Sequence, residues 1–126
     1  MGAMTDYLAD ALRDHVLRNT TYTSPATVYA ALFSTATTEV GTGTEVTGGS
    51  YARQAVTFSA GTPAGQAIAG GISFSSMPTV TVVALAIYDA ASGGNMLFHG
   101  RLPSARAVVS GETYVLNSSD LRILID

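Results

Sequence analysis

The chain has 126 residues, enough for one domain with a single core, and only 12% of them are charged. Its net charge is −3 and it contains no lysine, so we expect no binding to a nucleic-acid backbone. The absence of cysteine excludes disulfides, thiolate metal sites and cysteine nucleophiles. The longest apolar run, residues 80–88, is less than half of the ~20 residues that a membrane-spanning helix needs, so no membrane partner is expected.

The low charge limits what the surface of this domain can be. Soluble domains average about 25% charged residues, so Thr, Ser, Ala and Gly must cover much of the exterior. Such a surface fits a robust β domain with a hydroxyl-rich exterior, or a subunit that is buried against its neighbours. We favour the subunit, because 47% of the residues are hydrophobic and a domain of this size buries only about two-thirds of its surface.

The first segment of the chain is the one with helical periodicity. This periodicity predicts a helix over residues 5–19. The helix is expected to belong to a single domain that spans residues 5–126. Thr5 is the expected N-cap, and Asn19 is the expected residue just beyond the C-cap. Residues 1–4 are interpreted as a leader or a remnant of cloning and are left outside the predicted fold.

From residue 20 onward the pattern changes to period two and is interrupted by glycines, which predicts strands. The glycine pair at 70–71 is expected to kink one strand, and residues 89–95 are expected to form a hairpin turn. The fold class is therefore mainly β: an antiparallel β-sandwich or jelly-roll-like domain over residues 20–126, with one short N-terminal α-helix. The strands are expected over residues 27–34, 51–59, 66–74, 79–88, 96–102, 113–116 and 121–126.

The sequence matches no catalytic, metal or cofactor motif that we recognise. The two histidines, His15 and His99, lack the spacing of a metal pair, and we interpret both as structural. Asp89 and Asn95 are interpreted as groups that close a turn rather than as calcium ligands. We therefore expect neither enzyme activity nor a cofactor.

Four blocks of the sequence, in this order, resemble small virion structural proteins of tailed bacteriophages. They are residues 7–36, 43–60, 86–102 and 110–126, and they include a Gly-Gly-x-Tyr-x-Arg strand and an Asp-Ala-x-x-Gly-Gly-Asn hairpin. Proteins of this family are often labelled tail fibre or minor capsid proteins, and some decorate the head as cement proteins. The resemblance implies a β-rich virion component that has no catalytic residues and works as an oligomer.

The resemblance leaves two locations open within the virion. The chain is short and lacks the repeats or coiled coil of a fibre shaft, which favours a capsid decoration (cement) protein on the outside of the head shell. Its partner would then be the major capsid protein or another virion protein. The alternative is a tail fibre, tail-tip or host-adhesion β-sandwich module. A sugar-binding module would need exposed aromatic platforms, and the chain has no Trp and only six Tyr.

The chain is also expected to bind copies of itself as a symmetric homo-oligomer, because closed symmetry covers apolar surface without producing filaments. The resemblance implies a trimer, since decoration and fibre proteins often sit on three-fold axes. The helix and the last strand are the expected contact elements. The candidate contact residues are Leu8, Leu12, Val16, Leu17 and Leu124.

Overall fold

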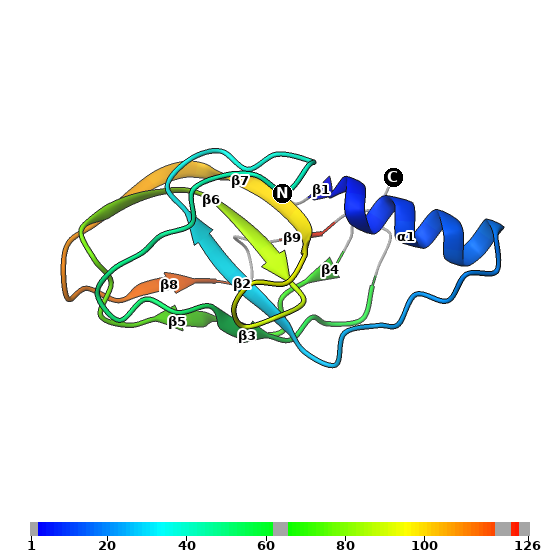
Figure 1. The fold of residues 1–126 in the computed structure, drawn as a ribbon. Coiled ribbons are helices and arrows are strands. Elements are labelled where there is room, and N and C mark those ends of the chain that lie inside the picture. Colours follow the sequence, from blue (N-terminus) through cyan, green and yellow to red (C-terminus); the bar gives the residue numbers. More distant parts are fainter. Residues whose placement is uncertain (1–2, 62–65, 118–121, 124–126) are drawn as a thin grey trace.

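The computed structural model describes residues 3–61, 66–117 and 122–123. It is mainly β, with antiparallel strands and one short helix, as predicted (Figure 1). In chain order the elements are β1 (Ala3–Met4), α1 (Asp6–Leu17), β2 (Val28–Phe33), β3 (Gln54–Val56), β4 (Gln66–Ala67), β5 (Ile72–Phe74), β6 (Val80–Tyr88), β7 (Met96–Val108), β8 (Tyr114–Leu116) and β9 (Arg122–Ile123).

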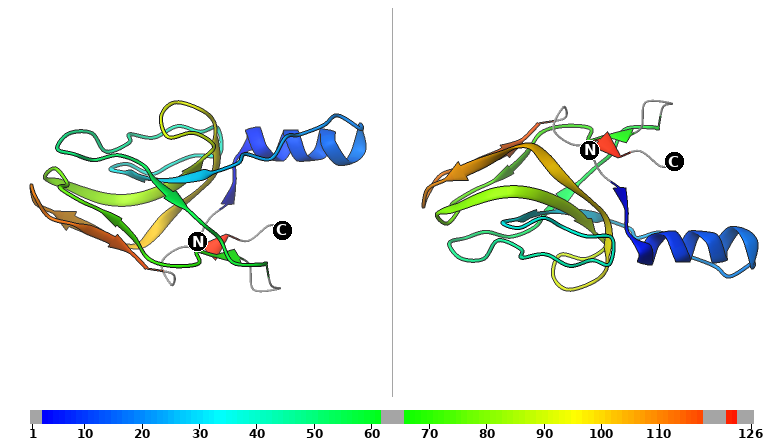
Figure 2. Two further views of the ribbon diagram at one scale, coloured as in Figure 1. Left: turned by 90° about the horizontal axis from the view of Figure 1, so that it is seen from below. Right: turned by 90° about the horizontal axis from the view of Figure 1, so that it is seen from above.

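A five-stranded antiparallel sheet forms the centre of the molecule, in the order β1-β7-β6-β2-β3. Consecutive residues of β6 are buried, as expected for an apolar, β-branched strand that is covered on both faces. The two-stranded β5–β8 ribbon lies over one face of the sheet and forms the second layer of a sandwich (Figure 2). The described strands do not confirm a jelly-roll topology.

The main core lies between the sheet and the β5–β8 ribbon. Phe74 of the ribbon is 1% exposed and stacks on Tyr51, with 6.0 Å between the ring centroids. Its other aromatic neighbour is Tyr114 of β8, whose ring lies edge-on at 6.2 Å. Because both layers contribute these rings, their packing holds the ribbon against the sheet.

The opposite face of the sheet has a smaller core, which a loop covers. Phe33, Ala84 and Met96 belong to this core. The covering loop passes so close to Phe33 that a Cβ added to Gly43 would lie 2.9 Å from the ring. The Gly/Thr-rich composition of residues 39–50 therefore serves close packing, since a larger side chain at Gly43 would lift the loop from the sheet.

The structure corrects the predicted bounds of three strands. The strand predicted over residues 51–59 is regular only in β3, and Phe58 continues it as a single bridge to Ile68. The strand predicted over residues 66–74 is divided into β4 and β5, on either side of the glycine pair. The strand predicted over residues 96–102 continues as far as Val108, because it pairs with β6 again after a register shift.

The ends of the chain also differ from the expectation. Ala3 and Met4, which the sequence analysis set outside the fold, pair with His99 and Phe98 of β7. Backbone pairing alone places them there, and two such residues carry no periodicity that sequence reasoning can detect. Of the strand predicted over residues 121–126, the part described is β9, which pairs with β4.

Gly49 is a position where we expect a substitution to be costly. A Cβ there would lie 2.7 Å from the Ser76 carbonyl oxygen, whereas a Cβ on Gly93 would meet open space. Both glycines have left-handed backbones, with φ of +56° and +62°. That conformation costs an L residue about 1–2 kcal/mol, so Gly93→Ala should lower the free energy of unfolding by about 1 kcal/mol and Gly49→Ala by about 2–3 kcal/mol. Urea denaturation measures both, and equal losses would contradict the close contact with Ser76.

Candidate functional site

Helix α1 projects from one end of the sandwich (Figures 1 and 2). Near its start, Leu8 is 5% exposed and Leu12 is half-buried, whereas Val16 and Leu17 at its far end are 74% and 77% exposed. Helices of about 12 residues obtain most of their stability from packing rather than from their own hydrogen bonds. The exposed apolar end of α1, which we call the helix tip (Val16–Arg18), is therefore the strongest candidate for contact with another molecule.

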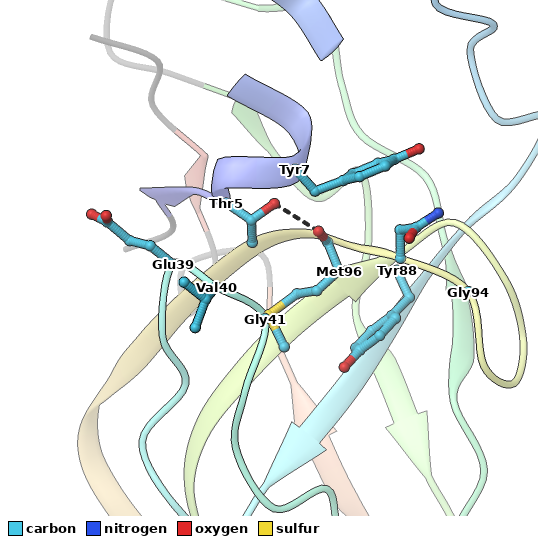
Figure 3. A pocket seen from close by; sticks show the side chains of 9 residues that line it. Thr5, Tyr7, Glu39, Val40, Gly41, Tyr88, Gly94 and Met96 are labelled. Carbon is cyan, nitrogen blue, oxygen red and sulfur yellow. Dashed lines mark hydrogen bonds between the residues drawn. The ribbon is translucent and has the colours of Figure 1, made fainter. Parts of the chain in front are cut away.

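The base of α1 is fixed to the sandwich by several hydrogen bonds. The Thr5 backbone N–H donates to the Leu97 carbonyl over 2.9 Å, and the Thr5 hydroxyl donates to the Met96 carbonyl over 2.7 Å (Figure 3). The Asp6 N–H donates to the Glu39 carbonyl over 2.8 Å. Thr5 is also the N-cap of the helix, as predicted. Strand β7 and the covering loop thus set the direction in which the helix projects.

The Thr5→Ala substitution tests this joint. It removes the capping oxygen and the hydrogen bond to Met96, and we expect it to lower the free energy of unfolding by about 1–2 kcal/mol. Far-ultraviolet circular dichroism and urea denaturation measure the helix content and the stability. Thr5→Ser is the matched control, since it keeps the hydroxyl and should retain most of the stability. Equal losses in the two variants would show that the hydroxyl is not the group that matters.

The far end of α1 is stabilised by contacts that are local in sequence. Asn19 ends the helix with a φ of +55°, as predicted for the residue beyond the C-cap. The Tyr22 N–H donates to Nδ1 of His15 over 3.1 Å, which ties the returning chain to the helix. Arg18 pairs with Asp14 over 3.4 Å, and their side chains are 72% and 42% exposed. His15 therefore has a structural contact, in agreement with its interpretation.

A notch of about 210 Å³ lies beside the helix base (Figure 3). Tyr7 and Val40 line it and are 45% and 72% exposed, and the partly buried Tyr88 lines it as well. The Tyr88 ring is in contact with two other side chains. The Arg53 guanidinium lies 3.7 Å from its centroid, and the Phe33 ring is parallel to it with 6.4 Å between the two centroids. Tyr88 thus does not offer the open platform that a sugar-binding site needs.

A largely buried ion pair, of Arg53 with Glu45, contacts Tyr88 of this notch. The Arg53 side chain is 8% exposed and binds Glu45 through two hydrogen bonds of 2.9 Å, from Nε and from Nη2. Its Nη1 donates to the Ala90 carbonyl over 3.0 Å and to the Gly93 carbonyl over 2.8 Å. Arg53, which directly precedes β3, thereby joins the covering loop to the hairpin of residues 89–95 in one network.

Tyr51 completes this network. Its hydroxyl donates to the Glu45 carboxylate over 2.8 Å and accepts the Leu32 N–H over 2.9 Å. Burial, together with the neighbouring Glu45 charge, raises the pKa of Tyr51 far above its usual value. The hydrogen bond to Glu45 likewise raises the pKa of Arg53. Both shifts favour the neutral phenol and the charged guanidinium, the forms that make these hydrogen bonds to Glu45.

Sequence reasoning missed this cluster. One signal was available: Glu45 and Arg53 are the only charged residues between Val40 and Tyr88. Isolated charges in an apolar stretch of a small β domain are often paired when they are buried. The pattern does not predict which carbonyls accept the other hydrogen bonds of the guanidinium, because these carbonyls belong to a hairpin that is distant in sequence.

The other polar residues singled out from the sequence have structural contacts. The Asp89 carboxylate accepts the Asn95 N–H over 2.8 Å and its side-chain amide over 3.3 Å, which closes the hairpin. His99 contacts Thr37 over 3.2 Å through Nδ1. Within residues 3–61, 66–117 and 122–123, no group of three His, Cys, Asp or Glu side chains is placed to hold a metal ion. In the same ranges, no helix has the length and apolarity to cross a membrane.

The predicted contact residues are distributed unevenly over the molecule. Leu8 is buried against its own chain and Leu12 partly so, because the first half of α1 docks on the sandwich. Val16 and Leu17 are exposed together at the helix tip. Leu124 lies outside the described residues. Of the predicted contact residues that the structure describes, Val16 and Leu17 are thus the most exposed.

The family model of the podophage GP4 fiber I protein gp80 matches residues 3–124. The chain belongs to this family. It is therefore a phage virion structural protein, as the resemblance implied. The description of the family names a fibre protein. The match includes Ala3 and Met4 of β1. Among curated proteins, none matches the chain.

Proposed function

We propose that the chain is a non-enzymatic subunit of a phage fibre, which binds copies of itself and another virion protein. The observation that carries this proposal is the helix tip, where Val16 and Leu17 are held in the solvent by a firmly attached helix. A helix with a fixed direction and an apolar end is suited to joining rigid units. The description of the family as a fibre protein favours this role over head decoration.

Capsid decoration is the second candidate, with the major capsid protein as partner. It is favoured by the sequence of these 126 residues, in which no shaft repeat or coiled coil is visible. Immunogold labelling of intact phage particles with antibodies against the chain separates the two roles. A fibre subunit is expected to give label at a few discrete positions on the particle. Uniform label over the head shell would replace the fibre role by decoration.

The proposed copy number is three, in a closed symmetric assembly. Sedimentation equilibrium of the purified chain should then give three times the 12.9 kDa mass of one copy. We expect Val16→Glu to dissociate the assembly, because it places a charge in an apolar contact. Val40→Glu is the matched control, since Val40 is equally exposed but lies at the helix base. A stable 12.9 kDa species at the highest soluble concentration would overturn the self-association.

Attachment to the virion is expected to resist salt. Only 12% of the residues are charged, so apolar and backbone contacts should dominate the interface. Exposed ion pairs contribute about 0–1 kcal/mol each and are screened by salt. Raising the ionic strength of purified particles to about 1 M should therefore release few copies, which gel densitometry of the supernatant measures. Complete release at moderate salt would contradict an apolar attachment.

A further inference from the structure

The two ends of the molecule carry features that complement each other. The helix tip is at one end, and the turn between β7 and β8 is at the other (Figure 1). Beside that turn lies a shallow hollow of about 460 Å³, lined by uncharged side chains. Val109, on its rim, is 56% exposed. The hollow is formed by Thr79, Val80, Thr81, Ala107, Val108 and Val109.

The proposed trimer needs two different surfaces of this kind. In a ring of three identical subunits, each copy uses one patch to contact another patch on the next copy. Within the described residues, exposed large apolar side chains away from the helix tip are few: Tyr7, Val40, Val109 and Val115. Val115 is only 36% exposed. Tyr7 and Val40 lie at the notch, and Val109 lies at the hollow. A third hollow of about 390 Å³ is lined by the ion pair of Glu45 and Arg53 and contains none of these exposed apolar side chains. The socket for the helix tip is therefore sought at the notch or at the hollow beside Val109.

The hollow is the better socket on grounds of size and chemistry. It has about 460 Å³, against about 210 Å³ for the notch. Valine, threonine and alanine line it, whereas the charged Glu39 and the amide of Asn95 belong to the notch. Two apolar side chains from the helix tip can be covered in the hollow without burying a charged group.

Charge also matches between the two ends. Arg18, next to Leu17, has a side chain that is 72% exposed and only a long contact of 3.4 Å to Asp14. At the rim of the hollow, the Glu112 carboxylate is exposed and accepts the Val109 N–H over 2.7 Å. In the part of the chain that the structure describes, Glu112 forms no ion pair. A cation at the helix tip and an anion beside the hollow favour head-to-tail contact over contact between like ends.

We propose that the helix tip of one copy inserts Val16 and Leu17 into the hollow beside Val109 of the next copy, where Arg18 meets Glu112. This contact rests on the proposed function and specifies which surfaces of successive subunits meet. A contact between two different patches closes into a ring when the rotation between subunits allows it and otherwise continues as a chain. The partner at the helix tip is thus a second copy of this chain.

A disulfide test is direct because the chain contains no cysteine. Leu17→Cys and Val109→Cys are prepared as separate proteins, mixed, oxidised and resolved on a non-reducing gel. A disulfide requires Cα atoms about 4.4–6.8 Å apart, so we expect the mixed dimer in about tenfold higher yield than from Leu17→Cys mixed with Val40→Cys. Val40 is the matched control, since it is 72% exposed and lies in the competing notch.

Other outcomes of this experiment overturn the contact. Efficient disulfide dimers of Leu17→Cys alone would show that two helix tips meet. Equal yields of the mixed dimers with Val40→Cys and with Val109→Cys would show that the disulfides form by random collision or that the socket is the notch. The mass of the unmodified chain separates this inference from the proposed function. An oligomer without the selective cross-link overturns the head-to-tail contact alone, and a monomer overturns both.

A charge exchange tests the polar part of the contact. Arg18→Glu and Glu112→Arg should each weaken self-association about three- to tenfold, because each places like charges face to face. The double variant restores an opposite pair and should recover the affinity of the unmodified chain in sedimentation velocity. A double variant as weak as the single ones would show that Arg18 and Glu112 do not meet.

Discussion

Replacing Arg53 by methionine is expected to lower the free energy of unfolding by about 3–5 kcal/mol. The loss arises mainly from the groups that Arg53 leaves behind. Glu45 is 25% exposed and would keep its charge without the guanidinium that binds both of its oxygens. The carbonyls of Ala90 and Gly93 would lose their donor as well. Urea denaturation of the variant measures the loss.

A double-variant cycle separates the ion pair from simple loss of packing. Arg53→Met combined with Glu45→Gln leaves no unpaired charge, so the combined loss should be smaller than the sum of the two single losses. Arg13→Met is the matched control for removing an arginine from an exposed pair, that of Arg13 with Asp10, and it should cost less than about 1 kcal/mol. Additive losses for Arg53 and Glu45 would contradict their coupling.

The Phe74→Ala substitution should also cost about 3–5 kcal/mol, because it empties a site between the two layers. Phe74 is 1% exposed and contacts the rings of Tyr51 and Tyr114. It belongs to β5, a strand of three residues, so the ribbon depends on this packing as well as on its pairing with β8. Thermal and urea denaturation should both show the loss.

Phe58→Ala is the control for this prediction. Phe58 is only partly buried at the edge of the same core, so its removal should cost about half as much as that of Phe74. If Phe58→Ala lowered the free energy of unfolding as much as Phe74→Ala does, Phe58 would have to lie inside the core rather than at its edge. A melting temperature unchanged in Phe58→Ala would remove Phe58 from the core altogether.

The elements that the sequence predicted well depend on residues near one another in the chain. The N-cap Thr5, the left-handed Asn19 and the hairpin glycines all adopt the expected local conformations. The apolar run in β6 correctly indicated a buried strand. In each case the hydrogen bonds, caps and backbone preferences that decide the conformation lie within a few residues.

The predictions that the structure corrected concern distant partners. Residues 51–59 alternate throughout, but only β3 pairs with β2, because the chain then leaves the sheet. Leu8 and Val16 lie on the same apolar face of the helix, yet of these two only Leu8 is buried against the sandwich. Periodicity records which side of an element is apolar, and it does not record where the neighbouring element ends.

The chain's composition and local patterns by themselves determined a mainly β domain with one capped helix and a weakly charged exterior. Only the tertiary structure decided that Arg53 would bridge Glu45 and the carbonyls of Ala90 and Gly93, and that the helix tip would stand clear of the sandwich. The reason is physical. Caps, turns and strand propensity act over a few residues, whereas ion pairing and burial depend on which distant segments the fold brings into contact.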